Sequence, residues 1–157
     1  MRIIITSNPE EWCTKGKQIA TLAERLEYYK EGVEAPIGTR YHAWLGTAET
    51  LEEQGDTDGA INAYKITLNH DRRSIPAWIN LGILLSKKGD LNGAKKAYQA
   101  ACDHDPKNST AWSNFSLGLH LEGDLEEATR ACQMAVELKP NNLTAWLNPR
   151  TLSHEDG

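Results

Sequence analysis

The sequence predicts an all-α fold in which copies of one helical hairpin stack on each other, and three repeated features support this. Four tryptophans recur every 34 residues, each preceded by alanine. They are Trp44, Trp78, Trp112 and Trp146. Each of the first three is followed at a constant distance by a Gly-Asp pair and then by an alanine. Such a long and strict interval exceeds the period of any single helix, so it indicates a structural unit laid down three times and begun a fourth time.

The second unit shows why each copy should begin with a helix. Between Pro76 and Lys88 the apolar residues are Trp78, Leu81, Ile83, Leu84 and Leu85. Their spacing predicts a helix that is buried on more than one side. Gly89 should end it, because glycine adopts the left-handed cap conformation at low cost, and Asp90 suits the start of the next helix.

The second helix of the same unit is predicted to pack closely on the first. Ala94, Ala97, Tyr98 and Ala101 recur at spacings of three and four residues. Ala94 leaves only a methyl group at the helix crossing, and the bulkier Tyr98 fills the space beside it. Pro106 then ends the unit, because proline cannot continue a helix. Each unit is therefore an antiparallel helix pair whose apolar face only a neighbouring unit can cover.

This spacing, W-x2-L-G-x2-Y followed by A-x3-F and P, resembles the tetratricopeptide repeat. The second unit matches nearly throughout, whereas the first has Arg72 where the proline would stand. The resemblance covers residues 41–148 and implies a right-handed superhelical α-solenoid of antiparallel helix pairs, with three repeats and a partial fourth. Pro149 interrupts the fourth unit, so we expect about one helical turn there and a flexible tail over residues 149–157.

Residues 1–40 do not match the repeat and predict an amphipathic helix followed by a linker. Asn8 and Pro9 favour a helix start, and Glu11 completes a pair resembling a capping box. An apolar stripe follows at Trp12, Ile19, Leu22, Leu26, Tyr29 and Val33. It predicts one helix of about 20 residues, with the linker over Gly32 to Thr39.

Three roles are open for this N-terminal helix. It could cap the first helix pair, because a terminal repeat needs a neighbour or a polar face. Its heptad-like register could instead form a self-association seam and give a homo-oligomer. It could also bind a partner.

Composition limits the possible partners. The chain has 157 residues, a net charge of −5 and no cluster of lysine and arginine, so we expect no nucleic-acid partner. No run approaches the roughly 18 apolar residues of a membrane span, so we expect no membrane insertion. The N-terminal apolar run is too short for a secretory signal. Three scattered cysteines predict reduced thiols in a cytoplasmic protein.

The family resemblance also implies a concave groove that is lined by the first helix of each unit and binds a peptide segment of a partner protein. Residues one, two and five positions after each tryptophan should face it. The expected groove residues are Leu45, Glu49, Ile79, Asn80, Ile83, Ser113, Asn114, Leu117 and Asn148.

Two features of this set suggest how a peptide would be held. Asn80, Asn114 and Asn148 recur at the repeat interval, and an asparagine side chain offers a donor and an acceptor to a peptide backbone. They resemble the asparagine ladder of the eukaryotic O-GlcNAc transferases, although asparagine is also common here in generic repeats. Gly46 departs from the ladder, so the first unit cannot contribute.

Charged and apolar positions give a second indication. Co-chaperone repeats bind a carboxylate tail with lysine, arginine and asparagine, and here only Asn80 fits that clamp, so the sequence lacks it. An apolar floor is expected instead from Leu45, Ile79, Ile83 and Leu117. Glu49, Glu52 and Glu53 predict an acidic entrance that favours a basic ligand residue, or else an ordinary solvated charged face.

No sequence motif predicts catalysis, a cofactor or a metal site. The sequence has no glycine loop for phosphate and no pair of Cys-x-x-Cys ligands. We therefore expect a non-catalytic protein–protein interaction module. The alternatives are a self-assembling structural scaffold, or a substrate-recruiting repeat subunit of a separate enzyme such as a glycosyltransferase.

Overall fold

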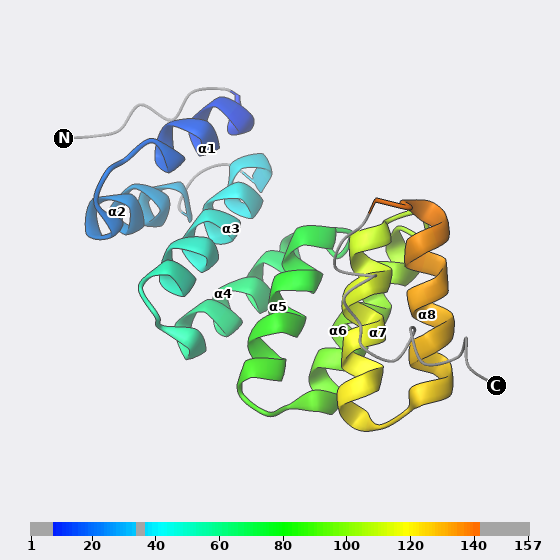
Figure 1. Cartoon of the computed structure of the whole chain (residues 1–157). Helices are drawn as coiled ribbons and strands as arrows, with labels where there is room; N and C mark the ends of the chain where they lie inside the picture. Colours follow the sequence, from blue (N-terminus) through cyan, green and yellow to red (C-terminus); the bar gives the residue numbers. More distant parts are fainter. Residues whose placement is uncertain (1–7, 34–36, 142–157) are drawn as a thin grey trace. The chain divides into compact units, whose positions relative to one another are not determined.

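The computed structural model describes residues 8–33 and 37–141, and every regular element in these ranges is an α-helix. The helices are α1 (Pro9–Lys17), α2 (Leu22–Val33), α3 (Ile37–Glu53), α4 (Thr57–His70), α5 (Ile75–Lys87), α6 (Leu91–His104), α7 (Ser109–Glu122) and α8 (Leu125–Leu138) (Figure 1). They form two compact units, Met1–Ala77 and Trp78–Gly157, with the boundary inside α5. The prediction of an all-α repeat fold is confirmed.

The N-terminal segment forms two helices, so the expectation of one helix of about 20 residues was wrong. Asn8 caps α1 as expected, because its side chain accepts a hydrogen bond from the Glu10 N–H at 3.1 Å. Glu11, the other member of the predicted capping pair, forms an ion pair with Lys15 at 2.8 Å. The chain then turns over residues 18–21 and α2 begins.

Local and long-range contacts both fix this turn. Thr21 accepts the Glu24 N–H at 3.3 Å and donates its hydroxyl to the Glu24 carboxylate at 2.7 Å. The Arg25 guanidinium donates to the Ile19 carbonyl at 3.1 Å and pairs with Glu53 of α3 at 2.7 Å. Arg25 therefore ties the turn between α1 and α2 to the next helix pair.

An aromatic cluster forms the core between α1, α2 and α3. Trp12 is fully buried and stacks on Tyr28 with ring centroids 4.7 Å apart. Tyr29 lies between two glycines, because a Cβ atom at Gly16 would be 2.6 Å from its ring and one at Gly46 would be 2.4 Å from it. Trp12 and Tyr29 are thus buried inside this unit. These two residues of the predicted apolar stripe are therefore not exposed for self-association.

The expected linker over Gly32 to Thr39 is also largely helical. Helix α2 continues to Val33 and α3 begins at Ile37, so Gly32 and Thr39 lie within helices. Residues 34–36 lie outside the described residues.

The predicted hairpin turns are confirmed in all three repeats. Gly55, Gly89 and Gly123 have φ angles of 82°, 86° and 91°, which is the left-handed region. The aspartate after each glycine caps the next helix: the Asp90 carboxylate, for example, accepts the Gly93 N–H at 2.8 Å.

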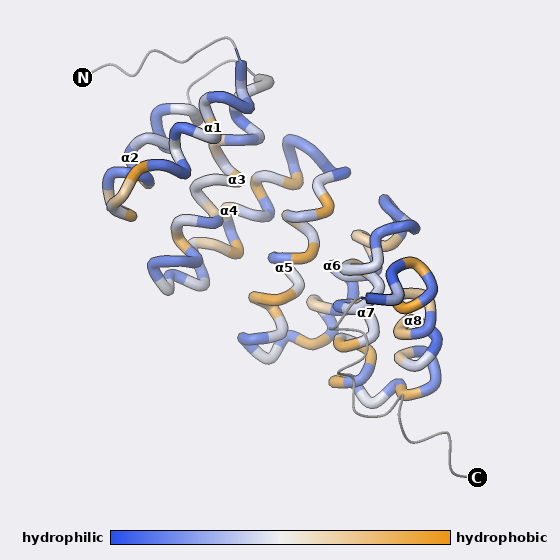
Figure 2. Tube along the Cα trace, turned by 45° about the horizontal axis from the view of Figure 1, so that its top comes forward, coloured by the Kyte–Doolittle hydropathy of each residue, from blue (hydrophilic) through white to orange (hydrophobic). Residues whose placement is uncertain are grey.

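In the second unit Tyr98 of α6 takes the place that Tyr29 has in the first. The ring is 1% exposed. A Cβ atom at Gly82 of α5 would lie 2.5 Å from it, and one at Gly118 of α7 would lie 3.0 Å from it. Both first helices of this unit therefore contact one ring. The apolar residues of α5 to α8 are orange in Figure 2.

Several predictions fall on residues that the structure does not describe. Trp146, Asn148 and Pro149 of the expected fourth unit lie there, as does the tail. Within the described ranges, no helix has both the length and the hydropathy that crossing a membrane requires.

Replacing Gly46 by alanine should destabilise the first unit by about 1–3 kcal/mol, because the added methyl group meets the Tyr29 ring. Chemical denaturation followed by circular dichroism measures this loss. In a Tyr29→Leu background the same Gly46→Ala change should cost less, since the ring is gone. Equal costs in both backgrounds would show that the Tyr29 contact does not constrain Gly46.

Candidate peptide-binding surface

The second unit exposes aliphatic side chains on the adjacent first helices of its two pairs. Gly82 and Gly118 approach opposite edges of the Tyr98 ring, so this ring of α6 contacts both α5 and α7. Ile83 follows Gly82 and Leu117 precedes Gly118, so each points about 100° away from the ring, in opposite senses. Both also stand five residues after their tryptophan, so they occupy equivalent repeat positions on α5 and α7. We call the set Ile79, Asn80, Ile83, Lys87, Asn114, Leu117 and Leu121 the α5–α7 surface.

The aliphatic members of this surface are open to solvent. Ile79 and Ile83 are partly exposed, and Leu117 is 46% exposed. Leu121, one turn after Leu117, is also 46% exposed. Ile79, Ile83 and Leu117 are thus accessible to a ligand, and their place in one groove stays a prediction.

Two members were not predicted from the sequence. Leu121 and Lys87 both stand nine residues after their tryptophan, one turn beyond Leu117 and Ile83. The signal was available, because residues four apart on a helix lie on the same side. Only three positions per unit were assigned to the groove, and these two fell outside them.

The polar groove residues are already engaged within the protein. The Asn114 amide donates to the Thr110 carbonyl at 2.9 Å, and Asn80 also has a partner. Ser113 is 6% exposed and its hydroxyl donates to the Ser109 carbonyl at 3.0 Å, so it is not presented to a ligand. Asn148 lies outside the described residues. The bond to Thr110 uses one N–H of Asn114 and leaves its amide oxygen, so the asparagine ladder stays a prediction.

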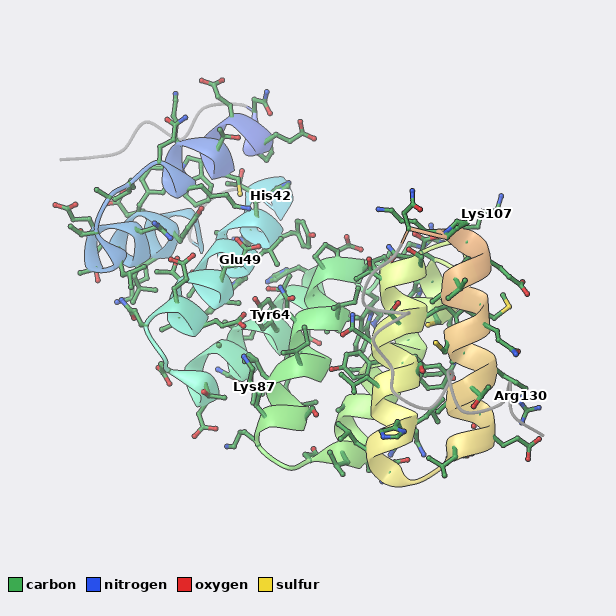
Figure 3. All side chains as sticks on the ribbon, in the orientation of Figure 1. His42, Glu49, Tyr64, Lys87, Lys107 and Arg130 are labelled. Carbon is green, nitrogen blue, oxygen red and sulfur yellow. The ribbon has the colours of Figure 1, made fainter. Side chains whose placement is uncertain are left out.

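The first unit satisfies its predicted groove residues internally. Glu49, labelled in Figure 3, pairs with Lys17 of α1 at 3.3 Å, and this carboxylate raises the pKa of Lys17. Glu53 pairs with Arg25, and Glu52 accepts the Tyr64 hydroxyl at 3.1 Å. Two of the three glutamates of the expected acidic entrance thus have basic partners from α1 and α2, and the entrance stays a prediction.

Other groove positions of this unit are partly covered. Leu45 is half-buried, and the Tyr29 ring covers Gly46. A polar pocket of about 310 Å³ lies nearby, lined by Lys17, Arg25, Tyr29, Glu49, Thr50 and Glu53. Its two bases and two carboxylates pair with one another. The pocket therefore offers no unpaired charge to a small ligand.

Neither Cys102 nor Cys13 is activated as a nucleophile. Burial, with a smaller contribution from Asp103, raises the pKa of Cys102 to about 12, and burial also raises that of Cys13. A nucleophilic thiol needs a lowered pKa, so neither suits that role. Within residues 8–33 and 37–141, no three His, Cys, Asp or Glu side chains gather where they could hold a metal ion.

Two family models, both described as tetratricopeptide repeat, match residues 75–108 and 42–71. No curated protein matches the sequence. These matches fall on the second and first predicted units, and α7 and α8 repeat the same hairpin geometry.

Solved structures share this fold at low sequence identity. A structure of MamA is 20% identical, with a TM-score of 0.73 over 85% of this chain and 79% of that chain. A MamA RS-1 ArsTM double mutant is 18% identical, with a TM-score of 0.77 over 96% and 89%. The first TPR of Spaghetti (RPAP3), bound to the HSP90 peptide SRMEEVD, is 21% identical, with a TM-score of 0.67 over 72% and 90%.

Cys102 should resist alkylation in the native protein. With its pKa raised to about 12, almost no thiolate is present at neutral pH. Iodoacetamide labelling followed by peptide mass spectrometry should modify Cys102 after denaturation but not before. Equal labelling in native and denatured samples would contradict the buried, protonated state.

Proposed function

Because the chain is a tetratricopeptide repeat protein, we propose that it is a non-catalytic interaction module that binds a segment of a partner protein on the α5–α7 surface. One observation carries this proposal. Ile79, Ile83, Leu117 and Leu121 are solvent-accessible aliphatic side chains on two helices that contact the same Tyr98 ring.

The energetics favour a partner on this surface. Burying one exposed leucine side chain contributes about 1.5–3 kcal/mol. A few such residues at the centre of an interface supply most of its binding free energy. Leu117 and Leu121, each 46% exposed, have substantial area still to bury.

The similar solved structures support peptide binding as a type of function, but they do not indicate the chemistry of the ligand. The RPAP3 repeat binds an HSP90 peptide, which shows that a related fold accepts a peptide. Here Leu45 and Glu49 stand where a carboxylate clamp would place a lysine and an asparagine. The ligand proposed for this chain is therefore an apolar segment rather than an acidic tail. The free, largely buried thiols support a reducing compartment such as the cytoplasm.

Replacing Leu117 by aspartate should weaken partner binding at least tenfold, because a charge would be buried at the centre of the contact. Leu125→Asp is the matched control. Leu125 is 40% exposed and is the first residue of α8, where an acidic residue is tolerated.

A photoreactive amino acid at position 117 tests the same surface directly. It should cross-link a partner that the same group at position 125 does not. A catalytic chain among the cross-linked partners would identify the protein as a recruiting subunit. Partner recovery that is equal for Leu117→Asp and Leu125→Asp would exclude the α5–α7 surface as the site.

Self-assembly is a second candidate function, and the outer side of α8 favours it. Met134 and Leu138 are 39% and 37% exposed and lie four residues apart on this helix. Sedimentation velocity over a range of concentrations should then show a dimer that Met134→Asp converts to a monomer. A wild-type chain that stays monomeric at all concentrations would exclude this candidate.

A further inference from the structure

We propose that the segment bound on the α5–α7 surface is an amphipathic α-helix, with aliphatic residues three or four positions apart and an acidic residue at one end of the apolar stripe. This inference rests on the proposed function and specifies its ligand. It follows from three properties of the surface: its few free polar groups, the spacing of its aliphatic residues and the charge of Lys87.

The surface offers little to an extended backbone. A peptide bound as a strand needs partners for its N–H and C=O groups, because unpaired polar groups lose free energy when buried. One N–H of Asn114 is used by the Thr110 carbonyl, Ser113 is buried and bonded to Ser109, and Asn80 has a partner, so few polar groups of the surface stay free for such a strand. A helical ligand pairs its backbone internally, so it needs none of these groups.

The aliphatic residues form two short rows that suit a helix. Ile79 and Ile83 are four residues apart on α5, as are Leu117 and Leu121 on α7. Four residues correspond to about 6 Å along a helix axis. A ligand helix presents anchors at the same spacing when apolar residues recur at i, i+3 or i+4, and i+7. Its side chains can then pack between the two rows, as ridges pack into grooves.

A single unpaired cation marks one end of the surface. Lys87 is exposed, lies four residues after Ile83 and has no acidic partner in the described part of the chain. The nearest acidic candidate on the other helix, Glu122 of α7, is paired with Lys95. An acidic ligand residue one turn beyond the aliphatic anchors would therefore meet Lys87.

Two displayed peptide libraries of matched composition test the ligand conformation. In one, aliphatic residues follow a three-and-four spacing on a helix-forming background. The other carries two central prolines, which exclude a continuous helix. Each library is selected on the full chain and counter-selected on Leu117→Asp, with Leu125→Asp as a control that should retain every binder.

The helix-patterned library should yield peptides that bind the wild-type chain and lose at least tenfold affinity for Leu117→Asp in fluorescence anisotropy. Two outcomes would overturn the helical ligand and leave the proposed function standing. In the first, only the proline library yields binders that are sensitive to Leu117→Asp. In the second, both libraries yield such binders equally. If neither library gives sensitive binders, both proposals are wrong.

The charge at position 87 gives a second, independent readout. Lys87→Glu should weaken the selected helical peptides about fivefold, as expected for a solvent-exposed ion pair. Exchanging the acidic residue of the peptide for lysine should restore affinity for Lys87→Glu. Peptides that bind Lys87→Glu as tightly as the wild-type chain would remove the acidic residue from the proposed ligand.

Discussion

A buried tyrosine ring between two glycine-bearing helices sets the spacing of the helix pairs in both units. Tyr29 lies against Gly16 and Gly46, and Tyr98 lies against Gly82 and Gly118. In each case one ring, from the second helix of a pair, contacts the first helix of its own pair and that of the next pair. The absence of a Cβ atom allows this approach, so both first helices pack directly against the ring.

The same spacing gives the two units different surfaces, because different side chains flank the glycines. In the first unit Glu49 follows Gly46 by three residues and pairs with Lys17 of the neighbouring first helix. In the second unit Ile83 and Leu117 flank Gly82 and Gly118, and their aliphatic side chains form no ion pair or hydrogen bond. One packing rule thus yields a surface with paired charges in one unit and an aliphatic surface in the other.

The sequence predicted those features that depend on local chemistry. Glycine at positive φ, aspartate at a helix start and alanine at a crossing each act within one repeat, so Gly89, Asp90 and Ala94 could be assigned from spacing alone. The turn between α1 and α2 was missed because the apolar stripe continues across it. Its local signal was the Thr21-x-x-Glu24 pair, but Arg25 reaching Glu53 is a long-range contact that periodicity does not reveal.

For the candidate site, the 34-residue repeat register predicted which residues would lie on the first helices. It did not predict which of their side chains would already be engaged by contacts within the protein. Leu117 was predicted on this face and is 46% exposed among the described residues of its unit. The engagement of Glu49 depends on a lysine 32 residues earlier in the chain, and that of Asn114 on a carbonyl of its own helix. Neither partner follows from the 34-residue spacing.

The distribution of exposed apolar residues directs any apolar contact to the second unit. In the described part of the chain, the large hydrophobic residues that are exposed all lie on α7 and α8. They are Leu117, Leu121, Leu125, Met134 and Leu138. The outward positions of α1 and α2 are instead rich in charge, such as Glu10, Glu24 and Lys30, which suits a capping pair that must stay hydrated. Exposed apolar residues that lie together mark interaction sites more often than isolated ones do, so Leu117 and Leu121 of α7 beside Ile79 and Ile83 favour a binding role for the α5–α7 surface.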